Sequence, residues 1–191
     1  MTAAIPELSG SFYAGVHPAK KEDFSVVAVL RKDEDALRLI HLNVFPQRTE
    51  YADVINYLKA LSERLKTIHR ILVDQTGAGE AAVEQAKKAV PNIEGIALTA
   101  PRKQKILGYV KLMMQEKRVL FPYELDFLQE LNAERFELTK SGQIQFSHPH
   151  GTHDDRFWAF TLAVFATKTT PTPKIRYSIS GRRKAKPRRN R

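Results

Sequence analysis

The spacing of apolar residues changes near residue 45, and this change constrains the fold more than any other feature. Before it come three short apolar runs, over residues 12–16, 24–30 and 36–44. The second run is rich in Val, and the third alternates apolar with charged residues, which is typical of β-strands. We expect the three to form an antiparallel meander, with turns at residues 18–23 and 32–35.

After residue 50, helical spacing alternates with short strands. Apolar residues recur three or four positions apart from Tyr51 to Leu65, which predicts a helix. Such an alternation indicates a mixed α/β sheet with helices on its faces. The remaining predicted elements are strands over 68–73, 93–98 and 119–121, helices over 80–89, from Pro101, over about 123–132 and over 154–165, and a hairpin of residues 136–138 and 143–146.

Basic residues are concentrated at the C-terminal end. Residues 168–191 contain ten Lys or Arg and no acid, whereas residues 1–167 contain 21 basic and 21 acidic residues. We therefore predict one folded domain over 1–167 and a basic, flexible tail over 168–191. The tail, including Arg182 and Arg183, suits phosphate groups and hence nucleic acid. A merely solubilising end is the alternative.

Several functional classes are disfavoured by what the sequence lacks. It has no cysteine, so disulfides and thiolate metal sites are excluded. No apolar run approaches the about 20 residues that a bilayer requires, and we expect an intracellular protein without a membrane span. There is no P-loop and no Gly-x-Ser-x-Gly elbow. His148, His150 and His153 lie close together, but their spacing matches no usual zinc motif.

Two places carry candidate acidic ligands. Asp74 ends the apolar run 71–73 and precedes a Gly-rich turn, and Asp154 and Asp155 begin an apolar helix. Each has a structural alternative as a helix cap or turn residue. A fold that brings these places together would have the start of a divalent-metal site, because sites in open α/β sheets lie beyond the carboxyl ends of strands.

Three further positions are open to two interpretations. Asp23, six residues after His17, either faces the same site or is a solvated turn residue. Lys103 and Lys105, near the start of the third helix, either contact phosphate or form the solvated face of that helix.

The order of four stretches resembles the nuclease domain of viral, tailed-phage type, large terminase subunits, which has a ribonuclease H-like fold. Together the stretches span roughly residues 12–166, and their order matches the strand and helix pattern expected of that fold. They are YAGVHPAKKEDFSVV over 13–27, ILVDQTGAG over 71–79, LTAPRK over 98–103, and GTHDD over 151–155 before the apolar helix.

The resemblance implies a two-metal endonuclease. In that family, acids from the first strand, a central strand and the C-terminal helix bind two divalent ions, Mg²⁺ or Mn²⁺. The matching positions are His17, Asp74 and the pair Asp154 and Asp155, of which Asp155 is favoured as the direct ligand; Asp23 would assist. The implied role is cleavage of double-stranded DNA during genome packaging in the host cytoplasm. The implied partners are the terminase ATPase domain, the small terminase subunit and the portal.

His17 departs from the family, which has an aspartate there as the bridging ligand. Imidazole cannot bridge two ions through two oxygens, and Mg²⁺ prefers oxygen ligands more strongly than Mn²⁺ does. We consider three hypotheses. The chain is a weakened or metal-shifted nuclease, a DNA-binding module without useful catalysis, or another ribonuclease H-like enzyme such as a junction resolvase or transposase-type nuclease. The resemblance is compatible with an excised domain of a large terminase subunit and with a stand-alone relative.

Overall fold

The predicted meander and the parallel strands that follow it form one mixed sheet. The structure is a computed structural model, which describes residues 10–18, 23–66, 68–138, 144–147 and 153–168. Six strands lie in the order β5-β4-β1-β2-β3-β6. β1–β2 and β2–β3 are antiparallel, whereas β1–β4, β4–β5 and β3–β6 are parallel. The strands are β1 Ser11–His17, β2 Val26–Lys32, β3 Leu37–Val44, β4 Ile68–Asp74, β5 Ile93–Ile96 and β6 Val119–Leu120.

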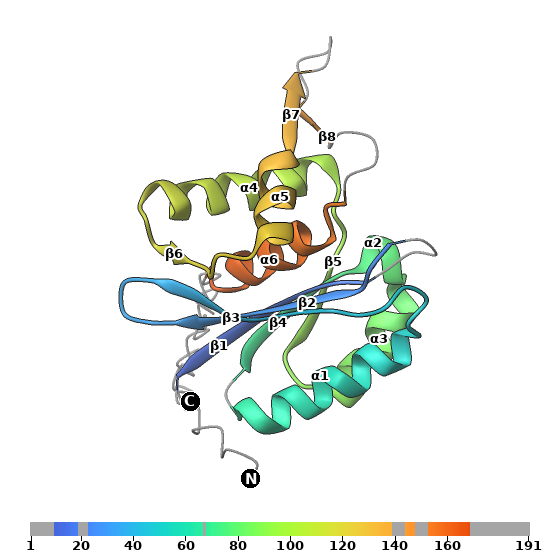
Figure 1. The fold of residues 1–191 in the computed structure, drawn as a ribbon. Coiled ribbons are helices and arrows are strands. Elements are labelled where there is room, and N and C mark those ends of the chain that lie inside the picture. The colour runs from blue at the N-terminus through green and yellow to red at the C-terminus, as the bar shows by residue number, and fades with distance from the viewer. Residues whose placement is uncertain (1–9, 19–22, 67, 139–143, 148–152, 169–191) are drawn as a thin grey trace, which may run out of the picture.

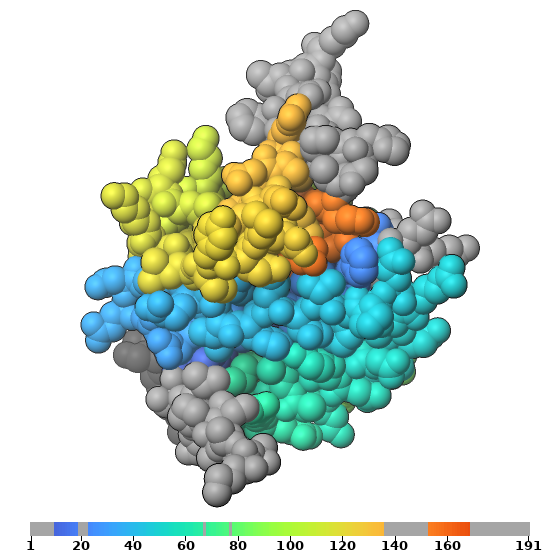
Figure 2. Space-filling view, viewed as in Figure 1, coloured from blue at the N-terminus to red at the C-terminus, as the bar shows by residue number. Residues whose placement is uncertain are grey.

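Helices cover both faces of this sheet, as predicted (Figure 1). α1 and α3 lie on one face, and α4, α5 and α6 lie on the other. Figure 2 shows the same three layers in space-filling form, with the blue and cyan strands between the green helices and the yellow and orange ones. The helices are α1 Tyr51–Leu65, α2 Gln75–Ala78, α3 Glu80–Ala89, α4 Ala100–Gln115, α5 Leu125–Ala133 and α6 Asp155–Ala166.

β2 shows how the two layers are joined. Val27 and Val29 belong to the core beneath α1 and α3, while Val26, Ala28 and Leu30 belong to the core beneath α5 and α6. Because side chains alternate across a strand, a nearly continuous apolar run buries both faces at once. All five residues are fully buried, which is why the run between residues 24 and 30 is so rich in Val.

The central pair of parallel strands places two predicted site residues side by side. β1 pairs with β4 in parallel, with Val16 opposite Val73. The next residue in each strand, His17 and Asp74, ends its strand at the same edge of the sheet. This is the carboxyl edge at which sites form in open α/β sheets.

Close packing at Gly15 brings α6 onto β1. A Cβ atom added to Gly15 would lie 2.1 Å from the Ala159 carbonyl oxygen and 2.3 Å from the Ala163 amide nitrogen. These are backbone atoms that cannot rotate away, so only glycine permits this approach. α6 itself is buried on nearly all sides and includes the fully buried Trp158 and Phe160. The approach carries the start of α6 to the end of β1.

The structure differs from the predicted elements in small ways. Residues 75–78 form the short helix α2, where the sequence suggested only a turn, and Gly79 follows it with a positive φ of 81°. The strand predicted over 93–98 ends at Ile96, because the Leu98 amide donates to the Thr76 side chain. β7 Arg135–Leu138 pairs with β8 Ile144–Ser147 as the predicted hairpin.

In the described ranges no helix combines the length and the apolar character that crossing a bilayer requires. The division of the chain at residue 167 stays a prediction, since the tail beyond residue 168 lies outside those ranges.

Candidate metal centre

Three side chains from distant parts of the sequence meet where β1, β4 and α6 come together. His17 Nδ1 lies 3.5 Å from Asp74 Oδ2, and His17 Nε2 lies 3.5 Å from Asp155 Oδ1. The two carboxylates are almost inaccessible, at 4% exposed for Asp74 and 2% for Asp155. The predicted meeting of Asp74 with the start of the C-terminal helix is therefore present, and the His17 ring lies between the two carboxylates.

Asp74 is held by the turn that follows its strand. The Thr76 amide donates a 2.8 Å hydrogen bond to Asp74 Oδ1, which makes Asp74 the N-cap of α2. Thr76 Oγ1 in turn accepts from the Leu98 amide at 2.9 Å, which ties this turn to the segment after β5. Capping occupies Oδ1 and leaves Oδ2 facing His17, so the structural and functional interpretations of Asp74 are compatible.

Asp155 is held by the chain entering β2. The Phe24 amide donates to Asp155 Oδ2 at 3.2 Å. Burial raises the pKa of the Asp155 carboxyl above its ordinary value, while the Phe24 hydrogen bond and His17 act in the opposite direction. Burial disfavours the charged form unless a partner compensates it. A carboxylate in this position is therefore favoured by a nearby positive charge.

Asp154 faces a small cavity beside the same edge. Its Oδ2 accepts a 2.9 Å hydrogen bond from the Trp158 indole, and it makes no side-chain capping bond to α6. Lys103 Nζ lies 4.5 Å from the centre of the Trp158 ring, a cation–π arrangement. The cavity has a volume of about 180 Å³ and is lined by His17, Pro18, Asp23, Asp74, Thr76, Leu98, Lys103, Asp154 and Trp158.

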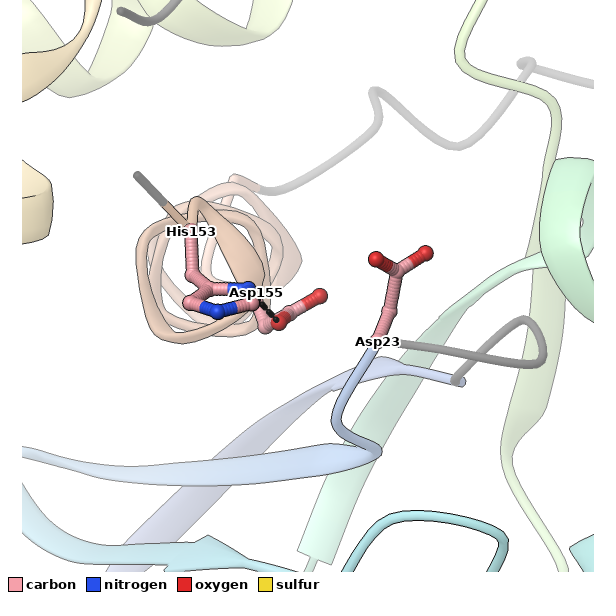
Figure 3. A group of neighbouring side chains, drawn as sticks. All are labelled: Asp23, His153 and Asp155. Carbon is pink, nitrogen blue, oxygen red and sulfur yellow. Dashed lines mark ion pairs between the residues drawn. The ribbon is translucent and has the colours of Figure 1, made fainter. Parts of the chain in front are cut away.

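Two more ligand types lie next to Asp155. His153 Nδ1 is 3.7 Å from Asp155 Oδ2, and one ligand atom each from Asp23, His153 and Asp155 lie within 4.8 Å of one another. Figure 3 shows His153 and Asp155 at the start of α6, with Asp23 on the segment that leads into β2. Asp23 therefore faces the site. The sequence analysis grouped His153 with His148 and His150 and did not place it near Asp23. His148 and His150 lie outside the described residues.

Glu130 anchors the start of α6 and was not found from the sequence. Its buried carboxylate accepts from the Arg156 amide at 2.7 Å and from the Phe157 amide at 3.2 Å, and it also pairs with the Arg156 guanidinium. These are the amide groups that a helix leaves unbonded at its first turn. A residue of α5 thus performs the capping that was the structural alternative for Asp154 and Asp155. Only the spacing of Glu130 on an amphipathic helix could have hinted at this.

The basic residues that were predicted to contact phosphate differ in where they lie. Lys103 lines the cavity, whereas Lys105 is exposed and is absent from the cavity lining. Arg182 and Arg183 lie outside the described residues.

Chemically, this arrangement suits a hard or borderline divalent cation. Four aspartates and two imidazoles converge on one edge, and neutralising that many acids requires positive charge. His17 Nδ1 is buried and makes no hydrogen bond within the described structure, despite its position near Asp74. The donor set is therefore compatible with metal coordination.

Comparison with known proteins agrees with the fold. A family model described as the terminase RNase H-like domain matches residues 14–167. Two curated relatives named "Terminase, large subunit", from Thermus phage G20c and Thermus virus P23-45, are 27% identical over 151 residues, covering 78% of this chain. The match covers 30% of each relative, so the chain spans less than a third of their length.

Solved structures give the same result. The large terminase nuclease from phage G20c superposes with a TM-score of 0.71 at 25% identity, over 80% of both chains. Its magnesium-bound structure gives 0.72 at 25% identity, over 81% of this chain and 80% of that one. The HK97 large terminase, 10% identical, shares the fold with a TM-score of 0.67 over 83% of this chain and 40% of its own. The chain therefore belongs to the family of terminase ribonuclease H-like domains.

Proposed function

We propose that this domain is a divalent-metal-dependent endonuclease that cuts double-stranded DNA during viral genome packaging. The observation that carries the proposal is the convergence of Asp74 and Asp155 on His17 at the carboxyl edge of β1 and β4. The relatives support it, since they are named as large terminase subunits, and one of them has been solved as a nuclease with magnesium bound.

Asp74 and Asp155 would hold the cations directly, with Asp154 and Asp23 beside them and His17 as a nitrogen ligand. A bound divalent ion there would polarise a phosphodiester and generate a nucleophile from water. Phe24 and Thr76 fix one oxygen of Asp155 and of Asp74. The ligands are therefore oriented before any ion arrives, which reduces the cost of binding.

Lys103 would place the DNA backbone. It lines the cavity that also contains Asp74 and Asp154, so its ammonium group can pair with a phosphate next to the acids. The acids alone would repel a polyanion, which explains why both cations and a nearby lysine are required. We also expect Arg182 and Arg183 to increase affinity without sequence preference.

The packaging role extends beyond this chain. The relatives are more than three times longer than the part that the chain matches. We propose that the domain works in the host cell beside a terminase ATPase domain, with the small terminase subunit and the portal as further partners.

A second candidate is a DNA-binding domain with little or no cleavage. The position of the His17 ring favours it, because each ring nitrogen faces one of the two carboxylates at 3.5 Å. An ion between Asp74 and Asp155 must therefore bind through this ring or displace it.

The test is cleavage of linear duplex DNA in Mg²⁺ and in Mn²⁺. Wild-type protein should cut, with more activity in Mn²⁺, while Asp74→Asn and Asp155→Asn should reduce the rate at least about 100-fold. Asp35→Asn, an exposed acid in the β2–β3 turn, serves as the matched control. Cleavage that persists in both site variants would refute these roles. No cleavage by wild type together with strong activity of His17→Asp would identify a nuclease disabled by its histidine. No cleavage by either would support the binding domain.

A further inference from the structure

β3 is paired along only part of its outer side. β6 pairs with its first two residues, and no described strand continues that pairing along residues 39–44. The Phe45 amide donates to the Ser25 carbonyl, on the β2 side. By the alternation of an antiparallel pair, the backbone groups of Leu42 and Val44 therefore point to the open side. Figure 2 shows the light-blue and cyan strand at the surface between the green and yellow helices. An open strand edge is a template for a further strand.

An apolar hollow lies along this open side, where the chain leaves β6 and enters α5. Its volume is about 310 Å³. Its lining includes three residues of β3 and three of the segment that enters α5, namely Leu39, Leu42, Val44, Pro122, Glu124 and Phe127.

The connection from β6 to α5 has the surface of a covered segment. Four large apolar side chains are exposed in the described ranges, and three of them, Leu120, Tyr123 and Leu125, lie on this connection. Glu124 Oε2 is buried there and accepts no hydrogen bond within the described structure. Exposed apolar groups beside an open strand edge indicate a surface that another segment covers. That segment should carry apolar side chains and a hydrogen-bond donor.

The C-terminal tail contains a segment with these properties. Its sequence is PKIRYSISG over residues 173–181. Ile175, Tyr177 and Ile179 alternate with polar residues between a proline and a glycine, which is the pattern of a strand with one apolar face. The Tyr177 hydroxyl on that face is a donor, which the Glu124 oxygen lacks.

The tail also starts at a suitable end of the sheet. The Lys168 carbonyl accepts a 3.4 Å hydrogen bond from Arg70, near the amino end of β4. Strands about 4.8 Å apart put the open side of β3 about 19 Å from β4, in the order β4-β1-β2-β3. Residues 169–174 can span about 20 Å when extended. A segment that then runs parallel to β3 ends beside Val44, which the strand register places in line with Val26 and His17.

We propose that residues 174–180 pair in parallel with residues 39–44 of β3 and add a seventh strand to the sheet. The basic run 182–191 then emerges at the carboxyl edge that holds the candidate metal centre. Docking shortens the free part of the tail and raises the local concentration of its positive charge at that edge. The pairing stands by itself, and only the effect on DNA rests on the proposed function.

Spin labels test the pairing and its direction. The chain has no cysteine, so one nitroxide can be attached at Arg182→Cys or at Thr172→Cys of the full chain. In ¹⁵N-labelled protein, the label at 182 should broaden the Val44 amide signal more than that of Leu37, and the label at 172 should do the reverse. No broadening of either amide would overturn the pairing, and the opposite order would overturn the parallel direction.

A mixing experiment identifies the source of the strand. Spin-labelled protein without ¹⁵N is added to ¹⁵N-labelled protein without a spin label. The Val44 signal should stay sharp, because the tail of the same chain occupies the edge. Broadening in the mixture would assign the edge to a second copy and overturn the proposal.

Tyr177→Pro tests what the pairing does. Proline removes a backbone donor and the apolar ring. We expect the Leu42 and Val44 amides to exchange with solvent about tenfold faster or more. Duplex DNA binding at fixed salt should weaken about fivefold. Ala185→Pro, in the basic run beyond the proposed strand, has the same charge and should behave as wild type does in both measurements.

The two measurements fail separately. Unchanged amide exchange in Tyr177→Pro would overturn the pairing, and since that assay contains neither DNA nor metal, the nuclease proposal would stand. Unchanged DNA affinity would overturn the delivery of the basic run to the carboxyl edge. Absence of cleavage in the Mg²⁺ and Mn²⁺ assays would count against the nuclease and leave the pairing intact.

Discussion

The two faces of the central sheet are covered in different ways. On one face, α1 and α3 pack through apolar side chains such as Val54 and Val83. On the other face, α6 touches the backbone of β1 at Gly15, and its first turn carries the buried Asp155. The first face contributes stability alone, whereas the second also sets the positions of the ligands. Stability and metal affinity should therefore be separable by mutation.

Gly15→Ala should have the largest effect, because it alters both properties. The new methyl group would overlap the backbone at Ala159 and Ala163, so α6 must move away from β1. We expect a loss of about 3 kcal/mol or more in the free energy of unfolding, together with weaker Mn²⁺ binding. Urea unfolding measures the change in stability, and Mn²⁺ titration measures the change in metal affinity. The control is Gly108→Ala in α4, where an added Cβ meets nothing within 4 Å. It should gain about 0.5–1 kcal/mol. Equal changes in unfolding free energy and Mn²⁺ affinity in Gly15→Ala and Gly108→Ala would show that close packing at Gly15 does not position α6.

Val54→Ala tests the opposite face. Val54 is fully buried beneath the sheet, so its truncation should cost about 2 kcal/mol of unfolding free energy. The Mn²⁺ affinity of the folded protein should be unchanged, because α1 contributes no ligand. The same urea and Mn²⁺ measurements apply. A fall in Mn²⁺ affinity in Val54→Ala would show that the two faces of the sheet are coupled, which would contradict the separation of stability from metal affinity.

Glu130 tests how α6 is held at its start. Glu130→Ala should lower the free energy of unfolding by about 1–2 kcal/mol, since it leaves the Arg156 and Phe157 amides unpaired. It should also weaken Mn²⁺ binding, because the adjacent Asp155 loses its support. Glu130→Gln retains an acceptor and should recover most of the stability. Asp126→Asn is the control, since this exposed carboxylate pairs with the guanidinium of the same arginine, Arg156, at 3.4 Å. Normal Mn²⁺ affinity in Glu130→Ala would show that Glu130 stabilises the helix without positioning the site.

The smallest expected effect is a pH dependence from Glu134. Burial, with Asp154 nearby, raises the pKa of Glu134 to about 7, while Lys103 opposes the shift. The folded state thus binds the proton more tightly than the unfolded state does. Stability should fall as the pH rises from about 5 to 7, by less than about 1 kcal/mol because the group is half-exposed. In Glu134→Gln, the urea unfolding midpoint of the metal-free protein should depend less on pH across this range than it does in wild type. An unaltered slope in that variant would assign the dependence to another group.

Much of this architecture was accessible from the order of residue types. The Val-rich run before residue 30 and the helical spacing after Tyr51 predicted the meander and the first helix, because burial imposes those periods. Asp74 was found because it follows an apolar strand, and Asp155 because it begins an apolar helix. In each case the signal lies within about ten neighbouring residues.

The features that were missed depend on contacts between distant segments. Glu130 caps a helix that begins 25 positions later in the chain, and such a partner leaves no local pattern. His153 lies near Asp23, yet its local spacing pointed only to His148 and His150. Lys103 could not be separated from Lys105 by sequence, since the difference is which one reaches Trp158. These relations require the packed fold.

The pairing of β1 with β4 has a consequence for how such a domain can diverge. Removing one residue from within Ser11–His17 would rotate the end of β1 to the opposite side of the sheet, so position 17 would no longer face Asp155. The connections beyond these strands have no such requirement and can lengthen or shorten freely. Related domains should therefore differ in loop length while keeping these two strands free of insertions and deletions.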